Sequence, residues 1–62
     1  MKNYKTMPYE TIMTEAPETR QEAKAIRIRL LEISRREYTT RGNTEKCQKI
    51  WKRVEAIDAL PL

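Results

Sequence analysis

The sequence predicts an all-α protein built on one antiparallel helical hairpin. Two long segments, about 16–38 and 44–59, carry apolar residues at helical spacing, and the short segment between them holds Gly42, the sole glycine. Two helical periods joined by a short connection of this kind favour antiparallel neighbours. We therefore divide the chain into an N-terminal arm, residues 1–14, and a hairpin domain, residues 15–62.

The arm has no sustained apolar period. Tyr9, Ile12 and Met13 follow Pro8 at the spacing of a single helical turn, so a short helix is one interpretation. A frayed terminus that covers the hairpin only loosely is the other. Because Tyr and Met are common at protein interfaces, an arm that wraps a partner subunit is a third.

The first long segment is predicted to be the main helix. Pro17 suits a first helical position, and Thr19 followed by Glu22 fits a capping box. The helix should therefore begin between about residues 15 and 20. Its main apolar residues recur at steps of three and four and form one narrow stripe. These residues are Ala23, Ile26, Leu30 and Ile33.

Other apolar residues of this helix lie outside the stripe. Leu31 and Tyr38 fall roughly 120 to 140° round the helix from Ile26, and Ile28 lies nearly opposite it. Apolar groups thus cover more than half of the circumference, which predicts two neighbours for this helix.

A strand is the competing prediction for part of the same segment. Residues 26–30 alternate between apolar and basic side chains, as a half-buried strand would. Residues 21–25 are strong helix formers, however, and Leu31 with Ile33 breaks the period of two. We favour the helix.

Residues 39–44 are the strongest loop signal in the chain. Gly42 suits the left-handed position after a helix C-terminus, and Asn43 or Thr44 suits the N-cap of the next helix. The second helix, about 44–59, has one clean apolar stripe, and Pro61 ends it. The stripe consists of Cys47, Ile50, Trp51, Val54 and Ile57.

A chain of 62 residues buries a modest fraction of its surface, so we expect a homodimer, in a four-helix or intertwined bundle. Trp51 is expected to anchor the core and to join the interface of such a dimer. The predicted core consists of Ile26, Leu30, Ile33, Ile50, Val54 and Ile57. The predicted dimer interface consists of Ile28, Leu31, Tyr38 and Trp51.

The net charge of +4 is unevenly distributed, because residues 20–53 carry eleven Lys or Arg and four Glu. Lys46, Lys49 and Arg53 fall within roughly 60° of arc on the second helix. Such a run usually forms a solvated face, and it can also contact phosphates or an acidic protein. The candidate residues for an anionic partner are Arg35, Arg36, Arg41, Lys46, Lys49, Lys52 and Arg53.

Little in the sequence points to catalysis. The chain has no histidine, and its single cysteine excludes an intrachain disulfide. Cys47 lies near a helix N-terminus between two lysines, which suits a reactive thiol. Without a general base nearby, we favour a small buried hydrophobe. We expect no catalytic residues, no cofactor and no metal site.

Two further expectations concern Glu37 and the cellular location. Glu37 lies on the main apolar stripe, so either the core ends there or Glu37 pairs with Arg41 one turn later. Apolar residues never run beyond two in succession, which excludes a transmembrane helix and the core of a signal peptide. A cytoplasmic location without membrane contact follows as an expectation.

The layout from about Ala16 to Leu60 resembles the small accessory proteins of temperate phages and prophages. The shared feature is a short basic chain folded as one helical hairpin, and several members are helical and dimeric. The resemblance implies a regulator that binds a host or phage protein. We therefore expect a non-enzymatic protein-interaction module, with a basic nucleic-acid-binding regulator as the alternative.

Overall fold

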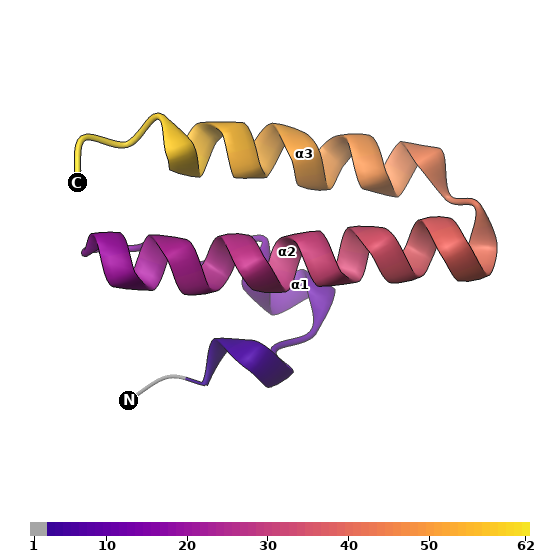
Figure 1. Ribbon diagram of the computed structural model, residues 1–62, viewed down its shortest axis with the longest axis horizontal. Helices are drawn as coiled ribbons and strands as arrows, with labels where there is room; N and C mark the ends of the chain where they lie inside the picture. Colours follow the sequence, from indigo (N-terminus) through magenta and orange to yellow (C-terminus); the bar gives the residue numbers. More distant parts are fainter. Residues whose placement is uncertain (1–2) are drawn as a thin grey trace.

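The computed structural model describes residues 3–62 and places four helical segments in them. A 3₁₀ turn, η1 (Tyr4–Thr6), and a short helix, α1 (Tyr9–Ile12), precede two long helices, α2 (Arg20–Arg41) and α3 (Thr44–Asp58). The long helices lie side by side and antiparallel, with the arm along one side of α2 (Figure 1). The all-α class and the hairpin are confirmed. The strand alternative for residues 26–30 is wrong, because these residues lie inside α2.

The start of α2 is fixed by Thr19, as the capping signal predicted. Its Oγ1 accepts a hydrogen bond from the backbone N–H of Glu22 at 3.1 Å, and its hydroxyl donates to Glu22 Oε1 at 3.3 Å. These bonds satisfy a donor that would otherwise remain free at the first turn. Pro17 is not the first helical residue, since it precedes the cap and is buried.

The connection between the long helices is shorter than predicted. α2 continues to Arg41, so only Gly42 and Asn43 separate it from α3. Gly42 adopts a left-handed φ of 62°, and its N–H donates to the carbonyl of Tyr38 at 3.0 Å. Asn43 caps α3 by accepting from the N–H of Lys46 at 3.1 Å. The left-handed glycine, rather than the weaker helix formers before it, ends α2.

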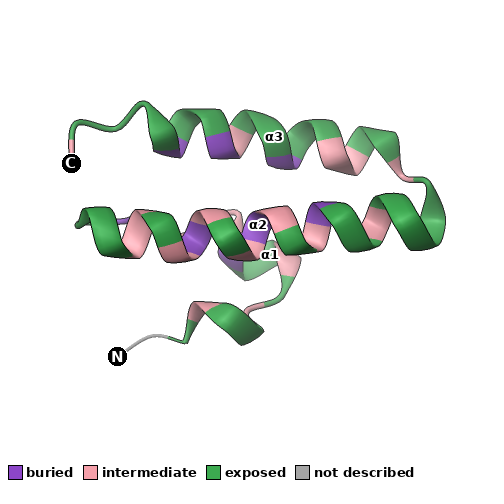
Figure 2. Cartoon of the chain, in the orientation of Figure 1, coloured by how far each residue is buried: buried purple, intermediate pink, exposed green. Residues whose placement is uncertain are grey.

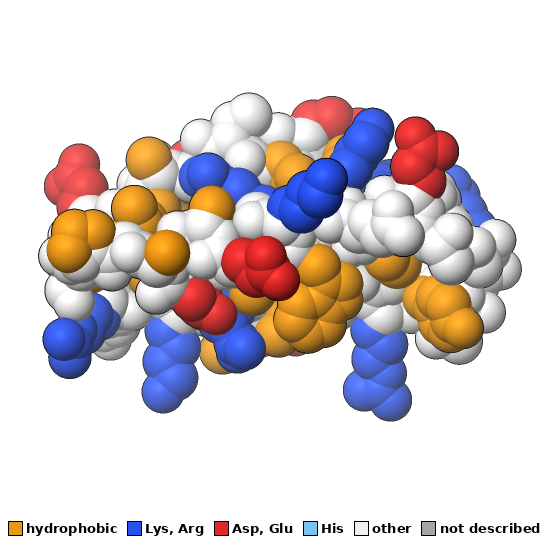
Figure 3. All heavy atoms as spheres, turned by 90° about the horizontal axis from the view of Figure 1, so that it is seen from above, with side chains coloured by type: hydrophobic (Ala, Val, Ile, Leu, Met, Phe, Trp, Pro, Cys, Tyr) orange, Lys and Arg blue, Asp and Glu red, His pale blue; other side chains and the backbone are white. Residues whose placement is uncertain are grey.

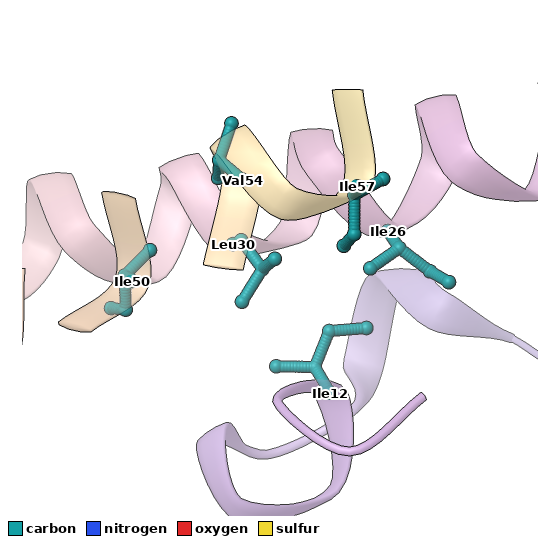
Figure 4. Packing of buried hydrophobic residues seen from close by; sticks show 6 residues of the cluster. All are labelled: Ile12, Ile26, Leu30, Ile50, Val54 and Ile57. Atoms are coloured by element: carbon teal, nitrogen blue, oxygen red, sulfur yellow. The ribbon is translucent and has the colours of Figure 1, made fainter. Parts of the chain in front are cut away.

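Six apolar side chains form the buried core between α2, α3 and the arm. Five of them were predicted, and their buried positions face each other across the hairpin (Figure 2). The sixth is Ile12, which points from α1 toward the long helices (Figure 4). Ile33 is only half-buried at the edge of this cluster. The core consists of Ile12, Ile26, Leu30, Ile50, Val54 and Ile57.

The core assignment of Trp51 is wrong, because 49% of this residue is exposed. The frayed alternative for the arm is also wrong for the described residues 3–14, while residues 1–2 of the predicted arm lie outside them. Ile12 and three polar or aromatic contacts fix the arm to α2 and α3, and a fourth contact holds the residue that follows it. The three join Tyr4 to Glu22, Met7 to Arg29 and Tyr9 to Lys46, and the fourth joins Glu15 to Arg53.

Candidate functional site

The arm occupies one side of the hairpin and leaves the opposite side uncovered. On α2, Ile26 and Arg29 point toward the arm, whereas Arg27 and Ser34 point toward α3. At 100° per residue, the apolar side chains of α2 that point away from the arm are those of Ile28, Leu31 and Tyr38. The same reasoning places Trp51 of α3 on this side. We call these four residues the aromatic face.

Most of the aromatic face is open to solvent. Ile28 and Trp51 are each 49% exposed, and Tyr38 is 63% exposed, whereas Leu31 is half-buried against the core. Figure 3 views the molecule from the α3 side and shows hydrophobic side chains at the surface among Lys and Arg side chains. The four residues predicted for a dimer interface thus lie on one side of the hairpin.

Contacts between the helices show which positions lie at the same level. Arg27 Nε lies 3.3 Å from Asp58 Oδ2, and the carbonyl of Ser34 accepts from Cys47 Sγ at 3.2 Å. Leu31 is halfway between Arg27 and Ser34, so it lies level with the middle of the segment 47–58. Trp51 is close to that level. Leu31 and Trp51 are therefore neighbours across the hairpin.

Two of the seven predicted anion-binding residues have partners within the protein. Lys46 Nζ lies 3.3 Å from Glu37 Oε1 and 4.3 Å from the centre of the Tyr9 ring. Arg53 donates to the backbone carbonyl of Glu15 at 2.6 Å. Both cations hold the arm or the turn, so neither is free for an external anion.

The other five candidates are exposed and have no ion pair within the described residues. Helical geometry points Arg36 away from α3, whereas Lys49 and Lys52 point away from α2. Arg35 lies beside the aromatic face, and Arg41 lies at the turn. These cations therefore occupy opposite edges of the hairpin and do not form one basic face.

Glu37 pairs with Lys46 rather than with Arg41. The side chain of Glu37 is only 15% exposed, and its Oε2 is buried without a hydrogen-bond partner. The sequence could not show this pair, since it depends on how α3 folds back over α2. The core does not simply end at Glu37, because the carboxylate is itself enclosed at the turn.

Cys47 and Ser34 form a second contact that sequence reasoning missed. Cys47 is half-buried, and its Sγ donates to the carbonyl of Ser34. Ser34 is buried one turn after Leu30. Ser34 follows Leu30 by four residues in the apolar stripe of α2, and this spacing is the signal that predicts its burial. Because its side chain is polar, the predicted core does not include it. Cys47 thus lies between the helices, but it is half-buried rather than buried as predicted.

One hollow, with a volume of about 670 Å³, lies between the arm and the start of α2. Tyr4, Glu18 and Glu22 line it together with two alanines, Thr19 and Gln21. Tyr4 donates to Glu22 Oε2 at 3.0 Å within it. Across residues 3–62, no three His, Cys, Asp or Glu side chains gather as a metal site would require.

No helix in residues 3–62 is both long and apolar enough to cross a membrane. Comparison of the chain with known protein families, curated proteins and solved structures finds no match. The candidate site therefore rests on the geometry of the aromatic face and its surrounding charges.

Proposed function

We propose that this protein is a non-enzymatic protein-interaction module whose docking surface is the aromatic face. One observation carries the proposal: three large apolar side chains, each about half exposed or more, lie on one side of a protein with 35% charged residues. Exposed apolar clusters with a polar rim are typical of interaction sites. Tyrosine and tryptophan are also enriched at the centres of interfaces.

The assembly that this surface supports is a four-helix arrangement of two hairpins. The aromatic face spans both long helices, so a helical surface of similar size would cover it. The arm lies on the other side and remains accessible. Each hairpin has a net charge of +4, so the outer edges of the assembled module favour acidic protein partners. A small regulator of the phage accessory type is the role that the hairpin layout supports.

Site-specific photo-crosslinking tests the docking surface. A photoreactive amino acid at position 51 should form crosslinks to protein that persist after nuclease treatment. The crosslinked protein is either a second copy of this chain or a different protein. The same group at Lys49, which is exposed on the outer edge of α3, should form few. Equal crosslinking from both positions, or none from position 51, would contradict the proposal.

Nucleic-acid binding is the second candidate function. Lys49 and Lys52 support it, because both are exposed on the same edge of α3 without an ion pair among the described residues. A gel shift with random duplex DNA at several salt concentrations tests it. The protein-interaction proposal predicts no submicromolar shift at physiological salt. A shift that Lys49→Glu with Lys52→Glu abolishes would assign the protein to nucleic-acid binding instead.

A further inference from the structure

We infer that a second copy of this chain covers the aromatic face, with the two-fold axis parallel to the long helices. In this arrangement α2 of one copy lies on α3 of the other, and each Trp51 packs against Leu31 of the other copy. The inference rests on the proposed docking surface and names its occupant. Two independent observations support it, the charge pattern around the face and the amount of exposed surface.

The first observation is that the two helices carry opposite charges beside the aromatic face. On this side α2 contributes Lys24 and Arg35, whereas α3 contributes Glu55 close to the centre line. An axis parallel to the helices places α2 against α3 of the other copy, so Lys24 lies about one turn from Glu55. Arg35 then faces the uncharged Gln48. A perpendicular axis would place α2 against α2 and bring Lys24 toward Arg35. The charges therefore select the parallel axis.

The rim of the face follows the same rule. Lys52 lies on the outer rim of α3, and Glu32 lies on the outer rim of α2 at nearly the same level. Rotation about an axis parallel to the helices keeps each residue at the same position along the helices. It also brings the outer rim of α3 onto the outer rim of α2 in the other copy. Lys52 of each copy therefore meets Glu32 of the other, while Leu31 and Trp51 meet at the centre because they also share a level.

The second observation is the size of the exposed surface. The accessible surface of the chain is 4847 Å². A compact monomer of 7.4 kDa would expose about 4,200 Å² by the usual scaling with mass. The chain thus exposes about 600 Å² more than a compact monomer of its mass. A standard interface buries roughly 800 Å² from each partner, so the excess is of the order that a second copy would cover.

A charge-swap experiment tests both the occupant and the axis. One variant changes α2, with Lys24→Glu and Arg35→Glu, and a second variant changes α3, with Gln48→Lys and Glu55→Lys. None of these four side chains makes an ion pair within the described residues, so the hairpin should remain folded, which circular dichroism checks. Each variant alone should raise the dimer Kd at least about tenfold, as measured by sedimentation equilibrium.

An equimolar mixture of the two variants should restore the dimer, because the acidic side chains introduced on α2 of one variant then face the lysines introduced on α3 of the other. The control is Arg36→Glu with Lys49→Glu, which lowers the net charge as much as the α2 variant does but changes the outer edges. This control should dimerise like the unaltered protein. Variants that dimerise normally alone, or a mixture that stays monomeric, would overturn the proposed arrangement.

A monomeric unaltered protein at about 200 µM would overturn the second copy as occupant. The proposed docking surface would survive that result if position 51 still crosslinked to another protein. The two experiments therefore separate a wrong occupant from a wrong surface.

Discussion

Ile12 is the residue that joins the N-terminal arm to the hairpin. It lies fully buried between α1 and the long helices, although it belongs to a helix of only four residues. A short helix has little stability of its own, so its order depends on tertiary packing. Ile12 is the fully buried part of that packing, and Met7, Tyr9 and Met13 pack against the core beside it. The polar contacts of the arm fix its direction.

We expect Ile12→Ala to lower the free energy of unfolding by roughly 2 to 4 kcal/mol, because the substitution leaves a cavity in a small core. Chemical denaturation at fixed protein concentration measures this change. Thr11→Ala, at an exposed neighbouring position, is the control and should alter stability by less than about 0.5 kcal/mol. Similar effects of the two substitutions would show that the arm does not pack as described.

Lys46 acts at the opposite end of the hairpin, where it contacts both Glu37 and Tyr9. Lys46→Ala should cost about 1 to 3 kcal/mol, since it leaves a mostly buried carboxylate without its cation. Adding Glu37→Gln should recover part of that loss, and a double-mutant cycle measures the coupling. Additive effects of the two substitutions would exclude a working ion pair. Lys49→Ala, on the exposed edge, is the matched control.

At the scale of the elements, Gly42 fixes the turn between α2 and α3. Its φ of 62° is unfavourable for residues with a Cβ, although no atom lies within 4 Å of the position that a Cβ would take. Gly42→Ala should therefore cost about 1 kcal/mol through backbone strain alone. Gly42→Asn should cost less, because asparagine tolerates the left-handed region. Equal melting temperatures for the three proteins would contradict this explanation.

The helices could be predicted from the sequence because their signals are local. Thr19, Gly42 and Asn43 act on backbone groups within a few residues, and the apolar stripes need only the period of the helix. The sequence predicts an end for α2 three residues before the observed one, because the two threonines before Arg41 are weak helix formers. The actual stop is the left-handed glycine.

The errors in the predicted core have a different cause. Trp51 lies at the edge of the α3 stripe, so its burial depends on which side of the hairpin the arm covers. The arm takes the other side, where Ile12 completes the core. The Glu37–Lys46 pair likewise depends on the fold of the whole chain. Periodicity within one segment carries no information about either contact.

At the scale of the whole molecule, the two sides of the hairpin differ. The arm lies along one side of the hairpin and completes the core (Figure 1), while Ile28, Tyr38 and Trp51 of the aromatic face remain exposed. A second copy on the open side would give both long helices the two neighbours that the apolar coverage of α2 predicts. The exposed cations then lie along the outer edges of a four-helix assembly.

The emission of Trp51, the only tryptophan in the chain, tests this assembly most directly. Its ring is half exposed in one chain and becomes enclosed when a second copy covers the aromatic face. We predict that the emission maximum of the intact protein moves to longer wavelength on dilution over about a thousandfold range, as the dimer dissociates. An emission maximum that does not change over that range would contradict burial of Trp51 against a second copy.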